Sequence, residues 1–171
     1  MALEREVKIV RTFDAPRELV WKAWTDAAHV ARWWGPRGFS NPVCEWDARP
    51  GGRIHIVMRA SEQIAKFIGK ADHPMTGEFT EVTPIERLAF TSAAVDEAGK
   101  PLLESLTTVL FIERDGTTEM VLHAQARGLV EIAGPMLDGM EAGWSQTIDK
   151  LEEHLAGGLD RMKPGPDGKL Q

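Results

Sequence analysis

The feature of this sequence that most constrains its fold is the long segment PMLDGMEAGWSQTIDKLEEHL at residues 135–155. Its large apolar side chains recur at steps of three or four residues, which is the spacing of a single stripe along an α-helix. The stripe consists of Leu137, Met140, Trp144, Ile148, Leu151 and Leu155. Because an amphipathic helix buries its stripe against another element, the rest of the chain has to supply a surface for it.

Two glycines, Gly139 and Gly143, interrupt this predicted helix. A glycine in the interior of a helix costs about 1 kcal/mol relative to alanine. Such a cost indicates either the close approach of another backbone or space that is left open beside the helix.

The segments before the helix alternate apolar and polar side chains and are separated by short turns, which predicts antiparallel strands. We expect strands at residues 4–13, 39–48, 52–60, 75–82, 87–95, 104–114 and 117–126. Two short helices are expected at 14–26 and 27–34, the second ended by Gly35 and Pro36. Segment 61–74 fits either a mobile loop or one short helix, and segments of this length often close over a site.

The order of these elements predicts an α+β fold in which a curved antiparallel β-sheet wraps around the long C-terminal helix. The two short helices after the first strand would then cover an open end, and a cavity or groove would remain between sheet and helix. With 171 residues the chain has the size of one domain. We assign residues 1–156 to this domain and predict that the tail 157–171 is disordered.

Charge and composition exclude several classes of function. The net charge of −6 gives the chain no attraction for nucleic acid or for an anionic membrane, and no apolar run reaches the length needed for membrane insertion. Cys44 is the only cysteine, and no two of the five histidines have the spacing of metal ligands. We therefore expect a cytoplasmic protein without a disulfide, metal or cofactor. The sequence leaves the oligomeric state open.

Three stretches of the chain resemble a known family. They are FDAPRELVWKAWTDAAHVARWWGPRGFSNPVCEWDARPGGRIHIVM (13–58), HPMTGEFTEVTPIERLAFTS (73–92) and MEAGWSQTIDKLEEHL (140–155). Together they are similar to the bacterial single-domain relatives of the activator of heat-shock protein 90 ATPase, within the START-like (Bet v 1-like, SRPBCC) superfamily. The resemblance covers roughly residues 5–156, and its most specific run is 13–58. It implies a helix-grip fold with an apolar cavity between sheet and C-terminal helix, and the family name implies a chaperone as partner.

Large aromatic, methionine and aliphatic side chains are the candidates for lining this cavity, because they suit a pocket that accepts apolar ligands. The candidates are Trp24, Trp33, Trp34, Ile56, Met58, Phe90, Met120, Met136, Met140 and Trp144. For each of them, ordinary packing in the core is the alternative. Within the adjacent tryptophan pair we expect Trp33 to anchor the short helix, because it shares a face with Val30, and Trp34 to lie at the mouth of the cavity.

Three ionisable residues are weaker candidates for catalysis. Glu45 and Asp47 share one face of their predicted strand, and His55 lies on the next one. If that face points inward, the two carboxylates are buried and able to act as acid or base. If it points outward, they form ion pairs on the solvent side.

Three functions from different classes follow. The first is binding of a small apolar or amphipathic molecule between sheet and helix, which the tryptophan and methionine content favours. The second is a co-chaperone-like activation of the heat-shock protein 90 ATPase, as the family name implies. The third is a cyclase- or hydrolase-type reaction on the same scaffold, which needs ionisable groups inside the cavity.

Overall fold

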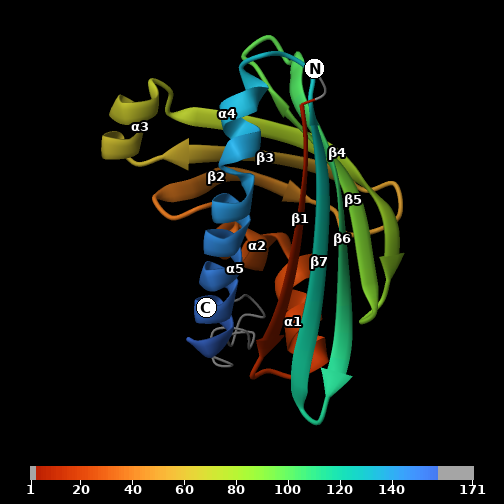
Figure 1. The fold of residues 1–171 in the computed structure, drawn as a ribbon. Helices are drawn as coiled ribbons and strands as arrows, with labels where there is room; N and C mark the ends of the chain where they lie inside the picture. The colour runs from red at the N-terminus through yellow and green to blue at the C-terminus, as the bar shows by residue number, and fades with distance from the viewer. Residues whose placement is uncertain (1–2, 158–171) are drawn as a thin grey trace.

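The structure of the chain is a computed structural model that describes residues 3–157. This part folds into one antiparallel sheet and five helices (Figure 1). The strands are β1 (Glu4–Phe13), β2 (Phe39–Trp46), β3 (Arg53–Ala60), β4 (Asp72–Thr83), β5 (Arg87–Val95), β6 (Pro101–Arg114) and β7 (Thr117–Gly128). The helices are α1 (Arg17–Thr25), α2 (Ala27–Trp33), α3 (Glu62–Ile68), α4 (Ala133–Asp138) and α5 (Met140–Ala156). The predicted α+β helix-grip fold is confirmed.

The seven strands are ordered β1-β7-β6-β5-β4-β3-β2, and each pairs with its neighbours antiparallel. From β2 to β7 the order follows the chain, whereas β1 pairs with β7 from Glu4 opposite Arg127 to Phe13 opposite Thr118. The sheet curves, and α5 runs along its inner side (Figure 1). Helix α2 contacts both β2 and α5, and this position covers one end of the inner face.

The C-terminal helix differs from its prediction in one respect. It is divided into α4 and α5 at Gly139, whose φ of −87° and ψ of −1° depart from helical values. The amide of Gly139 still donates to the carbonyl of Pro135 and its carbonyl accepts from Gly143, so the two helices follow each other with little interruption. The part of the predicted tail from residue 158 onward lies outside the described residues.

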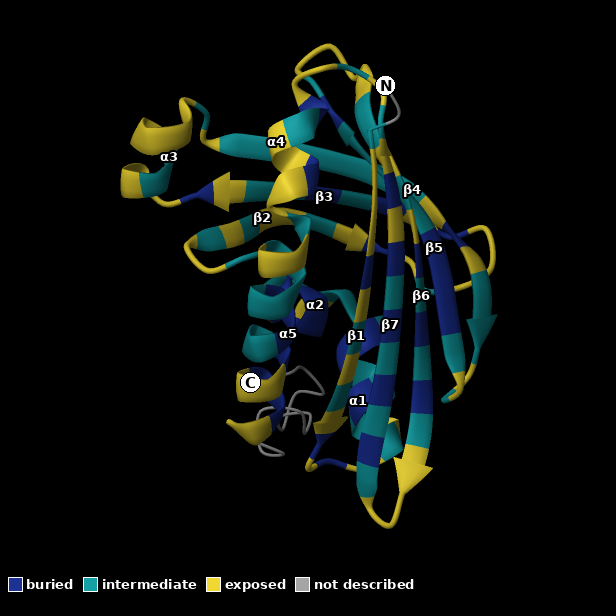
Figure 2. Cartoon of the chain, in the orientation of Figure 1, coloured by how far each residue is buried: buried dark blue, intermediate teal, exposed yellow. Residues whose placement is uncertain are grey.

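Segment 61–74 contains a short helix, one of the two predicted alternatives. Helix α3 begins after Ser61, whose hydroxyl accepts a hydrogen bond from the amide of Ile64, and ends at Gly69 in a left-handed conformation. It projects from the body of the molecule (Figure 1) and none of its residues is buried (Figure 2). Phe67 is 91% exposed, so this helix adds nothing to the core.

The core is centred on a group of six rings that we call the aromatic cluster: Trp24, Trp33, Trp34, Trp46, Phe79 and Phe90. Neighbouring rings lie close and mostly edge to face, with Trp24 and Trp33 centroids 4.7 Å apart and Trp46 and Phe79 centroids 5.0 Å apart. Two of the buried indole N–H groups donate to backbone carbonyls, Trp33 to Ala23 at 3.0 Å and Trp46 to Trp24 at 2.6 Å, whereas the N–H of Trp24 has no hydrogen-bond partner among the described residues. The cluster joins α1 and α2 to the sheet at one end of the inner face.

Within residues 3–157, no helix combines the length and the apolar character that crossing a bilayer requires.

Candidate ligand-binding groove

The inner face of the sheet changes abruptly in side-chain size next to the aromatic cluster. One row across β4–β7 consists of Phe79, Phe90, Thr107 and Ala124, which face one another in register. The adjacent inward row, two residues along each strand, consists of Gly77, Ser92, Ser105 and Ala126. We call this second set the small-residue row. It cannot reach as far toward the helix as the rings do.

The helix that faces this row also lacks side chains there. A Cβ atom added to Gly143 would have no other atom within 4 Å, and Gly139 is free of close contacts except with carbonyls of its own turn. The two gaps face each other across the interior and leave a groove of about 290 Å³ between sheet and helix. The space thus follows from residue size on both walls.

The groove has apolar walls that belong to several elements. Its aromatic wall consists of Trp34 and Trp144, whose ring centroids lie 5.5 Å apart at an angle of 81°. Four thioether side chains also line the groove: Met58, Met75, Met136 and Met140. Unbranched thioethers adapt their shape to a bound molecule and make favourable contacts with aromatic rings.

Few polar groups border the groove. Ser92 and Ser105 share a hydrogen bond of 2.7 Å between their hydroxyl oxygens. The hydroxyl of Thr147 donates to the carbonyl of Gly143 at 2.8 Å, and the ring of His73 makes a hydrogen bond with the carbonyl of Lys70 at 3.1 Å. No lysine, arginine, aspartate or glutamate is among the described residues that line it. The groove therefore offers an apolar environment with one polar point on its floor.

Half of the predicted ligand-binding residues border this groove. They are Trp34, Met58, Met136, Met140 and Trp144. The other five do not border it and have no solvent exposure: Trp24, Trp33, Ile56, Phe90 and Met120. These five side chains pack in the core because they lie in the aromatic cluster or on strand positions beside it. Of the adjacent pair, Trp33 is fully buried as expected of an anchor, and Trp34 is buried but borders the groove.

The three catalytic candidates lie elsewhere. Trp46 of β2 points into the core of the domain. Its neighbours Glu45 and Asp47 therefore point outward, and both are exposed. Asp47 pairs with the guanidinium of Arg49 at 2.7 Å, and half-buried His55 lies opposite Glu45 in register. None of the three borders the groove. The inward orientation considered for Glu45 and Asp47 is wrong, because both are exposed beside the buried Trp46.

Two further features bear on chemistry in the described part of the chain: the Cys44 thiol and the placement of potential metal ligands. Burial raises the pKa of the Cys44 thiol to about 11, which leaves it protonated and a poor nucleophile. Within residues 3–157, no group of three or more histidine, cysteine, aspartate or glutamate side chains is placed to hold a metal ion.

A buried histidine pair was not anticipated from the sequence. His29 of α2 and His154 of α5 are both buried, and Nδ1 of His29 lies 2.8 Å from Nε2 of His154. Burial lowers the pKa of His29, against the opposing effect of the Asp26 carboxylate, while Lys22 and Arg32 lower it further. The pair connects the end of α5 to α2, on the side of the aromatic cluster.

The groove residues that the sequence analysis missed carried a usable signal. Ser92 follows Phe90 by two residues, so once Phe90 is placed inward, strand alternation places Ser92 inward too. The same argument leads from Phe79, through Gly77, to the groove residue Met75. What alternation does not reveal is which inward positions face the gap in the helix.

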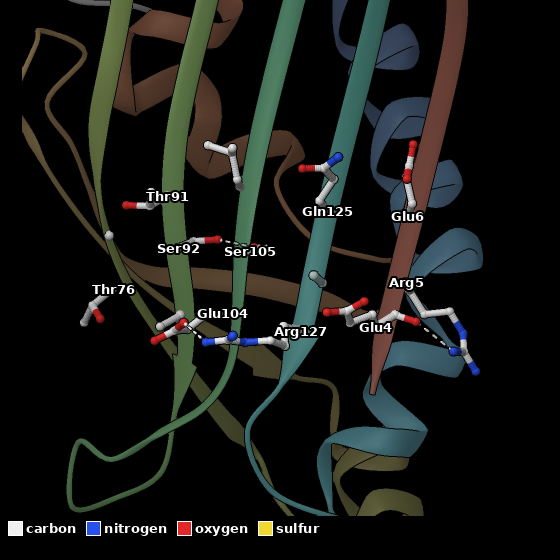
Figure 3. Close-up of a pocket in the computed structure, with 14 residues that line it drawn as sticks. Glu4, Arg5, Glu6, Thr76, Thr91, Ser92, Glu104, Ser105, Gln125 and Arg127 are labelled. Carbon is white, nitrogen blue, oxygen red and sulfur yellow. Dashed lines mark hydrogen bonds and ion pairs between the residues drawn. The ribbon is translucent and has the colours of Figure 1, made fainter. Parts of the chain in front are cut away.

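A second hollow of about 840 Å³ lies on the outer face of the sheet (Figure 3). Exposed charged residues surround it, including Glu4, Glu6, Glu104 and Arg127, and the last two form an ion pair at 3.6 Å. It borders the small-residue row from the side opposite to the groove, because Ser92, Ser105 and Ala126 line both. Its charged and exposed rim makes it a weaker candidate for holding a small molecule than the apolar groove.

Comparisons with known proteins agree with this architecture. A family model described as Activator of Hsp90 ATPase homolog 1-like protein matches residues 14–156. A crystal structure from Chromobacterium violaceum is 27% identical, with a TM-score of 0.69 over 88% of this chain and 96% of that one. The AHSA1 protein from Silicibacter pomeroyi is 25% identical, with a TM-score of 0.70 over 89% of this chain and 98% of that one. No curated protein matches the sequence.

Proposed function

The chain belongs to the family of Activator of Hsp90 ATPase homolog 1-like proteins, and from this premise we propose that it binds a small apolar or amphipathic molecule in the groove. The observation that supports the proposal is the coincidence of two gaps, the small-residue row on the sheet and Gly143 on α5, within walls of tryptophan and methionine. Natural ligand pockets have this combination of an apolar lining and few polar groups.

The energetics favour an apolar ligand. Each Å² of apolar surface that a ligand removes from water contributes about 25 cal/mol. The groove of about 290 Å³ lies near the lower end of the range for small-molecule pockets, so the ligand is compact. The four methionines permit some variation in its shape.

A substitution that fills the groove tests the proposal. In Gly143→Leu the new side chain occupies the open space beside α5, so we expect binding of the neutral fluorescent probe N-phenyl-1-naphthylamine to weaken at least tenfold, as measured by titration (about 1.4 kcal/mol per factor of ten). The melting temperature should not fall, because no atom lies within 4 Å of the added Cβ and leucine is a better helix former than glycine.

Gly134→Leu is the matched control. Gly134 is also helical, a Cβ there also has no atom within 4 Å, and it does not border the groove. It should bind the probe like the wild type. Equal binding by Gly143→Leu and the wild type, or no binding by the wild type, would overturn the proposal. Native mass spectrometry of protein purified from cells would then show whether any other molecule is carried.

Activation of the heat-shock protein 90 ATPase is the second candidate function, and the family match is what favours it. Purified chaperone with and without this chain tests it directly. Stimulation that survives in Gly143→Leu would place the chaperone contact outside the groove.

For location we propose the cytoplasm, because the single cysteine of the sequence is a free thiol.

A further inference from the structure

The serine pair on the groove floor has unused hydrogen-bonding capacity. Ser92 and Ser105 lie opposite each other on β5 and β6, and their oxygens are 2.7 Å apart (Figure 3). Two hydroxyls that share one hydrogen bond use one of their two hydrogens. Within residues 3–157 neither hydroxyl makes another hydrogen bond, so the pair retains one O–H donor and free lone pairs.

The other polar groups around the groove are already engaged. The Thr147 hydroxyl donates to a carbonyl of its own helix, and the His73 ring bonds to the carbonyl of Lys70. Lys150, one turn beyond Thr147, directs its ammonium to the carbonyls of Trp34 and Gly35 at 3.4 and 3.1 Å. The serine pair is therefore the point on the floor where a ligand group finds both a donor and an acceptor.

The same surroundings disfavour a charged ligand. A carboxylate or ammonium group placed in an apolar site without an opposite charge loses its hydration and regains little. No lysine, arginine, aspartate or glutamate is among the described residues that line the groove. A neutral hydroxyl or carbonyl group needs only the hydrogen bond that the serine pair supplies.

The walls favour a flat ligand. The floor includes the short side chains of Ser92, Ser105 and Ala126, and the edge-to-face pair of Trp34 and Trp144 forms part of the wall. Ring edges and faces pack well against indole and thioether groups. We propose that the ligand is an uncharged, flat ring compound with one hydroxyl or carbonyl group, which hydrogen-bonds to Ser92 and Ser105. This inference rests on the proposed function of the groove.

Three probes with one ring system test the inference: naphthalene, 2-naphthol and 2-naphthoate. For the wild type we expect 2-naphthol to bind about three- to tenfold more tightly than naphthalene, the effect of one net hydrogen bond. The anionic 2-naphthoate should bind most weakly. In the double variant Ser92→Ala/Ser105→Ala, 2-naphthol should fall to the affinity of naphthalene, while naphthalene itself binds as before.

The double substitution removes both hydroxyls together, so it leaves no buried group without its partner. If it nevertheless lost its cooperative melting transition, the relative affinities of the wild type for the three probes would still decide the inference. Thr91→Ala is the control, because Thr91 is the neighbour of Ser92 on β5 and borders the outer hollow instead of the groove. It should retain the preference for 2-naphthol.

The outcomes separate this inference from the proposed function. Equal affinity for naphthalene and 2-naphthol, with both weakened by Gly143→Leu, would overturn the inference and leave the groove as a ligand site. Tightest binding by 2-naphthoate would overturn the requirement for a neutral ligand. Failure of all three probes, together with failure of N-phenyl-1-naphthylamine, would overturn both.

Discussion

Two adjacent rows of the same sheet face have opposite roles. In the aromatic cluster, Phe79 and Phe90 fill the space between β4, β5 and the helices and are almost fully buried. Two residues along the same strands lie the smaller Gly77 and Ser92, and Ser92 borders the groove. The contrast shows that the stability of the fold and the presence of the groove depend on different rows of the sheet, although these rows share strands and register and Trp34 contacts both regions.

The strongest way to test this separation is to remove one tryptophan from each region. Trp33→Ala should lower the free energy of unfolding by about 3–5 kcal/mol, because Trp33 is fully buried and its loss leaves a cavity. Trp144 is half-buried at the groove, so Trp144→Ala should cost about 1–2 kcal/mol and weaken binding of N-phenyl-1-naphthylamine. Chemical denaturation and probe titration measure both effects. Equal losses of stability would mean that no functional boundary separates the two regions.

Smaller effects, of opposite sign in the sheet and in the helix, are expected when a glycine is replaced by alanine. A Cβ at Gly77 would collide with the backbone carbonyl of Thr91, so Gly77→Ala should destabilise by about 1–3 kcal/mol. Gly143→Ala meets no such contact and should stabilise by up to about 1 kcal/mol through helix propensity. Thermal melting of the two variants gives the signs. A stabilised Gly77→Ala would show that the sheet wall has room that the structure does not assign to it.

The smallest effect concerns the histidine pair at the aromatic end. Burial lowers the pKa of His29 below its unfolded value of about 6.5, so the unfolded chain binds more protons between these two values. The contribution of neutral, buried His29 to the free energy of unfolding is therefore complete above pH 6.5. It is lost as the pH falls toward the pKa of His29 in the folded chain. We expect His29→Gln to flatten the dependence of unfolding free energy on pH between 7 and 5. If the pH dependence of the unfolding free energy were the same in His29→Gln as in the wild type, His29 would not be its source.

The parts of the fold that follow a short-range pattern were predictable from the sequence. Strand alternation and the stripe from Leu137 to Leu155 gave the order of elements, and the face shared by Val30 and Trp33 separated the two tryptophans. The orientation of Glu45 stayed open, because Cys44 and Trp46 on one face and the carboxylates on the other fit either direction. Only the burial of Trp46 decides it.

The rest depends on contacts between distant segments. His29 and His154 are 125 residues apart, and no local pattern connects them. The same limit applies to the groove. Alternation tells which side of a strand Ser92 is on, but its position opposite Gly143 depends on where α5 crosses the sheet. Trp24 and Met120 are residue types that often line ligand pockets, but both lie in the core. Residue type alone does not show whether a position faces the groove or the core.

The pairing of β1 with β7 has a consequence for the folding of the chain during its synthesis on the ribosome. The hydroxyl of Thr118 donates to the carbonyl of Ala15 across 103 residues of chain, and β1 has its hydrogen-bonding partner only once β7 has been synthesised. Until then the apolar side chains Val7 and Phe13 lack the neighbours that bury them. Contacts between such distant segments slow folding, and the nascent chain exposes an unpaired strand that is prone to aggregate. Helix α5 is synthesised after β7, so it packs against the inner face only once all seven strands are available.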